Sequence, residues 1–251
     1  MRAVFLSDVH LCDADSIKAK LLLRFLRDVA SQYEKVYILG DLFDVWSGTN
    51  RYLIETFRPV LRALGNLVAA GHEVYYLEGN HDFRLGDYFT GELGVLTYSD
   101  GLEQQLGGRR IYMTHGDLGN PGELGYRVLR KVLRLDAVHS AMKLFPQKWI
   151  YMVGKRSAQL SREYQRCFLK SNLVSRMNVV RDIYRATATG ILEHGYDVVL
   201  MGHTHLPDDF PLILQGRSCR YINTGDWLQH FTYLEFDGMD FYTRTHPIIN
   251  L

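Results

Sequence analysis

The stretch Val36-Tyr-Ile-Leu-Gly-Asp-Leu-Phe-Asp44 joins a short apolar run to a pair of carboxylates. The run is continuous and partly β-branched, which is typical of a strand buried on both faces of a sheet. The glycine and the two aspartates follow where such a strand would end. In open α/β sheets the reactive crevice lies beyond the carboxyl ends of the strands. This stretch therefore predicts an α/β fold with a site at one edge of the sheet.

Four more places in the chain repeat this order of an apolar run followed by metal-ligand residues. The runs span residues 3–6, 74–77, 111–113 and 198–201. Because parallel strands end at one edge of a sheet, we expect the clusters to meet. They are Asp8-Val9-His10, Gly79-Asn80-His81-Asp82, His115-Gly116-Asp117 and Gly202-His203-Thr204-His205.

The chemistry of these clusters predicts a pair of metal ions. Imidazole and carboxylate ligands without cysteine suit manganese, iron or zinc, and their number is too large for one ion. Dinuclear sites hold their metals ~3.5–4 Å apart and clamp the attacking and leaving oxygens of an in-line displacement at phosphorus. We therefore expect hydrolysis of a phosphoester or phosphoanhydride. An isolated histidine is more often a structural group than a metal ligand. We assign a structural role to His72, His139, His194, His230 and His246.

The motifs DxH, GDxxD, GNHD, H and GHTH resemble those of the calcineurin-like metallophosphoesterases, over residues 8–205. The resemblance implies an α+β or α/β fold, a four-layer αββα sandwich, with Mn²⁺ as the first choice of metal and iron or zinc as alternatives. It also implies a bridging carboxylate at Asp41. One metal would be held by Asp8, His10, Asp41 and His205, and the other by Asp41, Asn80, His115 and His203.

His81 stands beside the proposed ligand Asn80. The resemblance implies that it faces the substrate, as a general acid or as a donor to a phosphoryl oxygen. Asp44 and Asp82 are candidates to orient His81 or a ligand imidazole, since carboxylates commonly fix the tautomer of such a histidine. Either aspartate could instead cap a helix.

Length and composition agree with a single enzyme domain. The 251 residues are 47% hydrophobic, enough for one substantial core and an insertion. No run of 18 uncharged apolar residues occurs, and Met1 leads directly into the first apolar run, so we expect a cytoplasmic protein. The three cysteines are irregularly spaced and absent from the ligand clusters, so we expect reduced thiols.

Charge is divided unevenly along the chain. Residues 124–185 contain fourteen Lys or Arg and three acids, a balance of +11, so the remainder carries −10 of the total of +1. The segment lies between the fourth and fifth clusters and lacks strand-like alternation. Apolar and basic residues alternate at near-helical spacing from Tyr126 to Arg134, and Pro146 is expected to separate two further helices. We therefore predict that residues 122–192 form a basic helical cap on a single domain of residues 1–251.

Two interpretations of the cap stay open. In one, its apolar residues pack on the sheet and its basic residues form a solvated face. In the other, the cap binds a substrate with an anionic head and an apolar tail, or docks on an anionic bilayer. Nucleic acid is disfavoured as a partner because the basic residues are interleaved with aliphatic side chains rather than glycine and stacking aromatics.

A narrower resemblance is to the UDP-2,3-diacylglucosamine pyrophosphohydrolases of lipid A biosynthesis. It is carried by residues 39–46, residues 79–83, the His115 cluster, Gly125-Tyr126 and the basic insertion. It implies cleavage of the pyrophosphate bond of an acylated nucleotide sugar to UMP and 2,3-diacylglucosamine 1-phosphate (lipid X). The enzyme would act peripherally at the cytoplasmic face of the inner membrane. The implied substrate contacts are Asn80, His81, Glu123, Tyr126, Arg127, Ser157, Ser161 and His203.

The chain departs from this narrower family at two points. His81 stands where the best-known branch has arginine, and Tyr164 stands where it has lysine. A phosphate leaving group needs a nearby cation more than a proton, whereas an alkoxide leaving group needs the proton. A soluble phosphodiesterase or nucleotide pyrophosphatase therefore stays open as an alternative. An inert interaction scaffold is a further alternative, although every ligand position is filled.

The rest of the chain supplies the elements around the site. Residues 16–32 and 52–70 are expected to form helices, the first capped by Ser16. Residues 220–223, 231–236 and 239–245 are expected to form the closing strands, with a hairpin at Asp237-Gly238.

Overall fold

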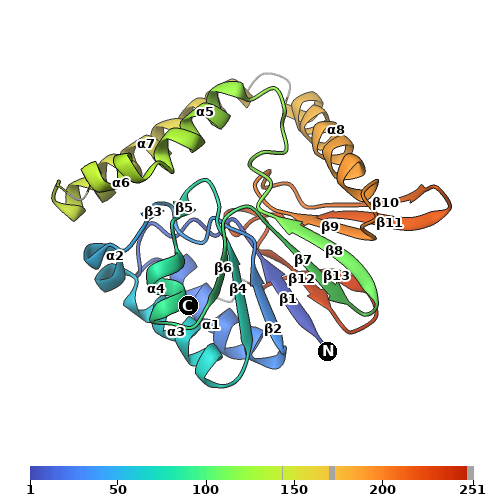
Figure 1. Ribbon diagram of the computed structural model, residues 1–251, viewed down its shortest axis with the longest axis horizontal. Helices are drawn as coiled ribbons and strands as arrows, with labels where there is room; N and C mark the ends of the chain where they lie inside the picture. Colours follow the sequence, from blue (N-terminus) through green and yellow to red (C-terminus); the bar gives the residue numbers. More distant parts are fainter. Residues whose placement is uncertain (143, 170–172, 248–251) are drawn as a thin grey trace.

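The computed structural model describes residues 1–142, 144–169 and 173–247, and of these the side chains of residues 158, 159, 161–169, 173 and 174 are not described. Two sheets pack face to face, with helices on their outer sides (Figure 1). The six-stranded sheet has the order β13 (Phe241–Thr245), β12 (Thr232–Phe236), β1 (Ala3–Leu6), β2 (Lys35–Ile38), β4 (Glu73–Leu77) and β6 (Leu96–Tyr98).

The second sheet has five strands and a different mixture of directions. Its order is β10 (Asp208–Leu214), β11 (Arg217–Asn223), β9 (Val198–Met201), β8 (Arg109–Thr114) and β7 (Gly101–Leu106). Strand β9 runs parallel to both of its neighbours, while β10 and β7 are antiparallel edge strands. In the first sheet β1, β2, β4 and β6 are parallel and β12 is antiparallel to β1. A separate pair, β3 (Trp46–Ser47) and β5 (Asp82–Phe83), joins two site loops.

Three apolar clusters fill the three interfaces between four layers. The first lies between the six-stranded sheet and helices α1 (Ile17–Asp28) and α3 (Arg58–Ala69), and includes Phe25 and Leu64. The second lies between the two sheets and includes Phe5 and Met113. The third lies between the five-stranded sheet and α8 (Leu173–Leu192). The four-layer αββα sandwich predicted from the sequence is confirmed.

Two helices begin and end differently from the prediction. Ser16 does cap α1, since its Oγ accepts a hydrogen bond from Ala19 N at 3.2 Å, but α1 ends at Asp28 and only a 3₁₀ turn, η1 (Ala30–Gln32), follows. The expected helix over residues 52–70 is wrong as one unit, because it divides into α2 (Arg51–Thr56) and α3. Pro59 at the start of α3 lacks the N–H that a continuous helix needs.

Two of the closing strands begin at other residues than the sequence predicts. Strand β11 begins at Arg217, whereas β13 begins only at Phe241. The Asp237 carboxylate accepts hydrogen bonds from the backbone N–H groups of Met239 and Asp240, which keeps both residues in the turn. The sequence analysis does not predict strands β3, β5, β6, β7 and β10.

Between β8 and β9 the chain forms α5 (Leu124–Leu133), α6 (Asp136–Met142) and α7 (Gln147–Leu169), followed by α8. Helices α5 to α7 lie together along one side of the sandwich, and α4 (Gly86–Gly91) lies against β6 (Figure 1). The predicted cap range 122–192 also contains α8, whose Tyr184, Ala188 and Leu192 pack on the five-stranded sheet. Pro146 precedes α7, as expected for a residue that separates helices.

Membrane-spanning helices were sought over the described ranges. None of the helices there combines the length and the apolar character that crossing a bilayer requires.

Candidate metal centre and active site

The seven proposed metal ligands all lie in loops that follow strands. Asp8 and His10 follow β1, Asp41 follows β2, and the remaining four follow β4, β8 and β9. Both sheets therefore deliver ligands to the same place. Five of the ligands have left-handed backbone, with φ between 50° and 68°, which is uncommon for residues with a Cβ atom and clusters at functional sites. They are Asp8, His10, Asp41, His203 and His205.

The glycines of the motifs allow backbone to pack directly against ligand carboxylates. A Cβ atom on Gly79 would lie 2.0 Å from Oδ1 of Asp41, and one on Gly202 would lie 2.5 Å from Oδ2 of Asp8. No side chain fits at such distances. The glycine that precedes Asn80 and the one that precedes His203 are therefore required by this packing.

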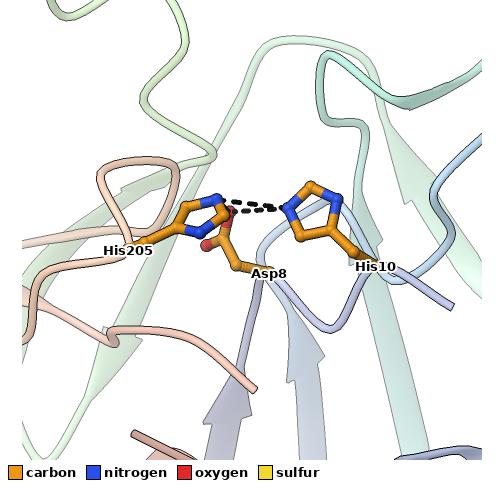
Figure 2. Close-up of side chains that lie close together, drawn as sticks. All are labelled: Asp8, His10 and His205. Carbon is orange, nitrogen blue, oxygen red and sulfur yellow. Dashed lines mark hydrogen bonds and ion pairs between the residues drawn. The ribbon is translucent and has the colours of Figure 1, made fainter. Parts of the chain in front are cut away.

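The first group of ligands consists of Asp8, His10 and His205, whose side chains converge (Figure 2). The Nε2 atoms of the two histidines lie 3.2 Å apart, and Nε2 of His205 lies 3.3 Å from Oδ1 of Asp8. Nε2 of His10 lies 3.8 Å from the same oxygen and 3.7 Å from Oδ2 of Asp41. Two imidazole nitrogens and two carboxylates thus face one small volume.

The second group shares Asp41 with the first. Nε2 of His115 lies 3.4 Å from Oδ2 of Asp41 and 2.9 Å from Oδ1 of Asn80. Nδ1 of His203 lies 2.9 Å from the same Asn80 oxygen and 3.3 Å from Nε2 of His115. Asp41 Oδ2 is the atom that lies within 4 Å of a histidine of each group, as expected of a carboxylate between two ions.

The donor set fits cations. Oδ1 of Asp8 is buried and has no hydrogen-bond partner among the described residues. Burial disfavours charge on His205, yet Asp8 and Asp226 raise the pKa of its imidazole to about 10. Burial and the neighbouring His115 lower the pKa of His203 to about 4. The buried carboxylates thus attract positive charge while part of the donor set stays neutral, which is the environment that two divalent ions require.

A comparison of the sequence with protein families decides the classification. The model of the calcineurin-like phosphoesterases matches residues 1–207. The chain belongs to this family. Calcineurin-like phosphoesterases are metal-dependent hydrolases with a dinuclear metal centre, and the residue groups described above could hold the ions.

This calcineurin-like phosphoesterase is similar to several curated bacterial proteins over nearly its whole length. It is 30% identical to the UDP-2,3-diacylglucosamine hydrolase of Aeromonas salmonicida, with 93% of this chain and 89% of the relative covered. It is 31% identical to the protein of that name from Stenotrophomonas maltophilia, covering 95% and 96%. It is 30% identical to that of Azotobacter vinelandii, covering 99% and 100%.

The phosphoesterase places His81 against the first ligand group. Its ring meets the ring of His10 edge-on, with centroids 4.8 Å apart. The backbone N–H of His81 donates to Oδ1 of Asp41 at 2.9 Å, and Nδ1 lies 2.9 Å from the backbone oxygen of Asp44. A hydrogen bond from Nδ1–H to this carbonyl leaves Nε2 for other partners. Burial lowers the pKa of the His81 imidazole.

Asp44 and Asp82 support the site in different ways. Oδ1 of Asp44 lies 3.7 Å from Nδ1 of His10, on the far side of that ring from the proposed metal. Asp82 is contacted by loop backbone rather than by an imidazole. Its carboxylate accepts hydrogen bonds from the backbone N–H groups of Asp41, Phe43 and Gly79 and from the hydroxyl of Tyr76. Burial and the charge of Asp41 raise the pKa of Asp82 to about 7.

Asp226 is a site residue that the sequence analysis missed. It is buried, with Oδ2 3.5 Å from Nδ1 of His205. A signal was present, because Thr224-Gly225-Asp226 follows the carboxyl end of β11 in the way that the five predicted clusters follow their strands.

The predicted substrate contacts on the cap are scattered. Tyr126 donates its hydroxyl to the carboxylate of Asp117, and Arg127 donates to the backbone oxygen of Leu118 at 2.6 Å. Glu123 is exposed at the start of α5, and Ser157 is exposed on α7. The side chain of Ser161 lies outside the described residues, as does that of Tyr164.

Helix α5 faces the site with its polar side. Nε of Arg130 donates to Asp117 at 2.8 Å, and Arg134 pairs with Glu78 next to the Asn80 loop. Only 13% and 17% of these two arginine side chains is exposed, compared with 62% of Val128 and 53% of Leu129. The interpretation in which the apolar residues of the cap pack on the sheet is therefore wrong for this helix, because buried acids on the body bind its arginines.

Proposed function

We propose that this chain hydrolyses the pyrophosphate bond of UDP-2,3-diacylglucosamine, releasing UMP and 2,3-diacylglucosamine 1-phosphate, a step of lipid A biosynthesis. The metal-ligand geometry supports a hydrolase of phosphorus substrates. The names of the relatives support the acylated nucleotide sugar, and the matches extend over the cap as well as the sandwich.

The observation that carries the lipid part of the proposal is the outward apolar face of the cap. Apolar side chains that would normally be buried are exposed on α5, between α6 and α7, and along α7. The opposite face of α5 contacts the loops of the proposed ligands, and α7 contacts the loop after His10 through Tyr151 and Lys155. A substrate with a diphosphate head and two acyl chains would place its charged head at the ligand loops and its acyl chains on the outward apolar face. The exposed residues include Leu124, Val128, Leu129, Val132, Phe145, Trp149, Met152 and Val153.

The metal-binding roles follow from the two groups described above. We propose one ion held by Asp8, His10, Asp41 and His205 and one held by Asp41, Asn80, His115 and His203. Manganese suits this set of oxygen and imidazole donors without thiolate, with iron or zinc as alternatives. When bound, the ions would neutralise charge on the phosphoryl oxygens and on the attacking and leaving oxygens.

The protein's own side chains position the diphosphate. His81 is proposed to donate to a phosphoryl oxygen from Nε2 as the imidazolium, because its Nδ1–H is already donated to the backbone oxygen of Asp44. Asn80 and His203 extend the polar wall on the side of the second group. Tyr126 and Arg127 stand at the start of α5 and are proposed to border the sugar, with Glu123 and Ser157 further out.

We further propose that the same apolar face lies against the cytoplasmic surface of the inner membrane, where an acylated substrate resides. Exposed lysines and arginines beside it, among them Lys131, Lys148 and Arg156, would favour anionic lipid by ~1 kcal/mol each. Sedimentation with phosphatidylglycerol vesicles, but not with phosphatidylcholine vesicles, is the expected result. Equal recovery in the supernatant with both vesicle types would reject the membrane part.

Identification of products tests the proposed reaction. Purified protein with Mn²⁺ should convert UDP-2,3-diacylglucosamine to equal amounts of UMP and an acylated sugar phosphate, measured by mass spectrometry. The Asp41→Ala variant should release neither product. Release of UDP in place of UMP would reject the pyrophosphate as the bond that breaks.

A further inference from the structure

The loop that follows β11 contacts two proposed ligands of the first metal. The backbone N–H of Trp227 donates to the backbone oxygen of Asp8 at 3.1 Å. The hydroxyl of Ser7, next to Asp8, lies 2.7 Å from that of Thr224 and donates to the backbone oxygen of Gly225 at 3.3 Å. No motif used to assign the metal ligands includes this loop. It nevertheless contacts both Asp8 and His205.

Asp226 is the charged residue of this loop, and both of its carboxylate oxygens have partners. Oδ1 accepts hydrogen bonds from the backbone N–H groups of Gln229 and His230 at 3.0 and 2.9 Å, and lies 3.1 Å from Nδ1 of His230. Oδ2 lies 3.5 Å from Nδ1 of His205. The first oxygen fixes the carboxylate, so that the second faces the imidazole.

The opposite nitrogen of His205 faces the ligand group. Nε2 lies 3.3 Å from Oδ1 of Asp8 and 3.2 Å from Nε2 of His10 (Figure 2). An outer carboxylate on one ring nitrogen fixes the tautomer that presents a lone pair on the other, and it makes that lone pair more basic. We propose that Asp226 is a positioning residue that holds His205 in the orientation needed to bind the first metal ion.

In the second ligand group, the residue that contacts the outer nitrogen of a ligand histidine is uncharged at the contact. Nδ1 of His115 lies 2.7 Å from the backbone oxygen of Leu39, so its outer partner is a carbonyl without charge. Loss of the Asp226 charge should therefore weaken the first site and leave the His115 site unchanged. This inference rests on the metal pair of the proposed function and is independent of its substrate.

Manganese binding to the intact protein tests the role of Asp226. Asp226→Asn keeps the shape of the side chain and removes its charge, and Asp87→Asn removes a charge from an exposed position on α4. Wild type and Asp87→Asn should bind two Mn²⁺ per chain, with the electron paramagnetic resonance spectrum of a coupled pair. Asp226→Asn should bind one of the two ions about 10–100-fold more weakly than wild type does. At the same loading with Mn²⁺, its spectrum should show the six lines of isolated Mn²⁺.

Unfolding of the metal-free proteins separates positioning from folding. Asp226→Asn should unfold in one cooperative transition, with a midpoint below that of Asp87→Asn, because it loses the buried charge that faces His205. Equal weakening of both ions would assign Asp226 a purely structural role and overturn the proposal. Two ions bound with wild-type affinity by Asp226→Asn would also overturn it, while leaving the metal centre in place. Fewer than two ions in wild type would reject the metal centre itself, and with it the role of Asp226.

Discussion

Arg130 on α5 forms an ion pair with Asp117, two residues beyond His115, with 2.8 Å between Nε and Oδ2. The carboxylate is buried and also accepts a hydrogen bond from Tyr126 of the same helix. Nη2 of Arg130 donates to the backbone oxygen of Ser99 at 3.1 Å. An ion pair therefore attaches α5 of the cap to the loop that carries the proposed ligand His115. The apolar side of α5 faces outward.

Replacement of Arg130 by methionine should lower the free energy of unfolding by about 1–3 kcal/mol. The reason is that the buried Asp117 loses its charged partner, while Tyr126 still donates to it. Urea denaturation of the metal-free protein measures the change. Arg156→Met on the exposed side of α7 is the control, with an expected change within about 0.5 kcal/mol. Equal losses in the two variants would show that the ion pair contributes nothing specific.

Chelation should abolish hydrolysis, and added Mn²⁺ should restore it in wild type but not in Asp41→Asn. Oδ2 of Asp41 lies 3.7 Å from Nε2 of His10 and 3.4 Å from Nε2 of His115, so this substitution affects both groups. Metal analysis after dialysis should give two ions per chain for wild type and fewer for the variant. Two firmly held ions in Asp41→Asn would contradict the bridging position.

Substitutions at His81 separate a proton donor from a fixed cation. His81→Ala should lower turnover by about 10²–10⁴-fold and leave both metals bound. His81→Arg should recover much of the activity on a pyrophosphate, whose leaving group needs a cation, and little on a diester with an alkoxide leaving group. Steady-state rates on the two substrate types measure this. Full activity of His81→Ala would remove the residue from the reaction.

The outward face of α5 should matter for acylated substrate alone. Leu129→Asp should raise KM for UDP-2,3-diacylglucosamine by about tenfold or more, because burial of such a side chain contributes about 1.5–3 kcal/mol. Kinetics on bis-p-nitrophenyl phosphate should not change. Ser140→Asp adds the same charge to an exposed position on α6 and is the matched control. If Leu129→Asp slowed both substrates equally, the face would have no role in binding lipid.

The strands that lead to the site could be predicted because each has a continuous apolar run that ends in ligand residues. The apolar run before Asp8 is a fully buried strand, the strand before Asp41 is buried except for Lys35, and the predicted clusters come together. Asp226 was missed because its apolar run is interrupted by Arg220 and because an isolated aspartate after a strand is a weak signal. The break between α2 and α3 depends on Pro59, which the helical periodicity of that segment masks.

The orientation of α5 could not be predicted from its amphipathic pattern. The pattern shows that two faces differ and does not show which of them meets the body. Here the choice depends on two acids that are buried next to the site: Asp117, 13 residues before Arg130, and Glu78, 56 residues before Arg134. The left-handed backbone at residues such as His203 and His205 is likewise imposed by the packing of loops rather than by their own conformational preference.

The most direct test of this account is the rate of UMP release, with Mn²⁺ present, from UDP-2,3-diacylglucosamine and from the same nucleotide sugar without acyl chains. Bis-p-nitrophenyl phosphate serves as the small-diester reference and Asp41→Ala as the inactive control. The account predicts rapid release from the acylated substrate and far slower reaction with the other two. Faster hydrolysis of the small substrates would keep the metal chemistry and contradict the assignment to an acylated nucleotide sugar.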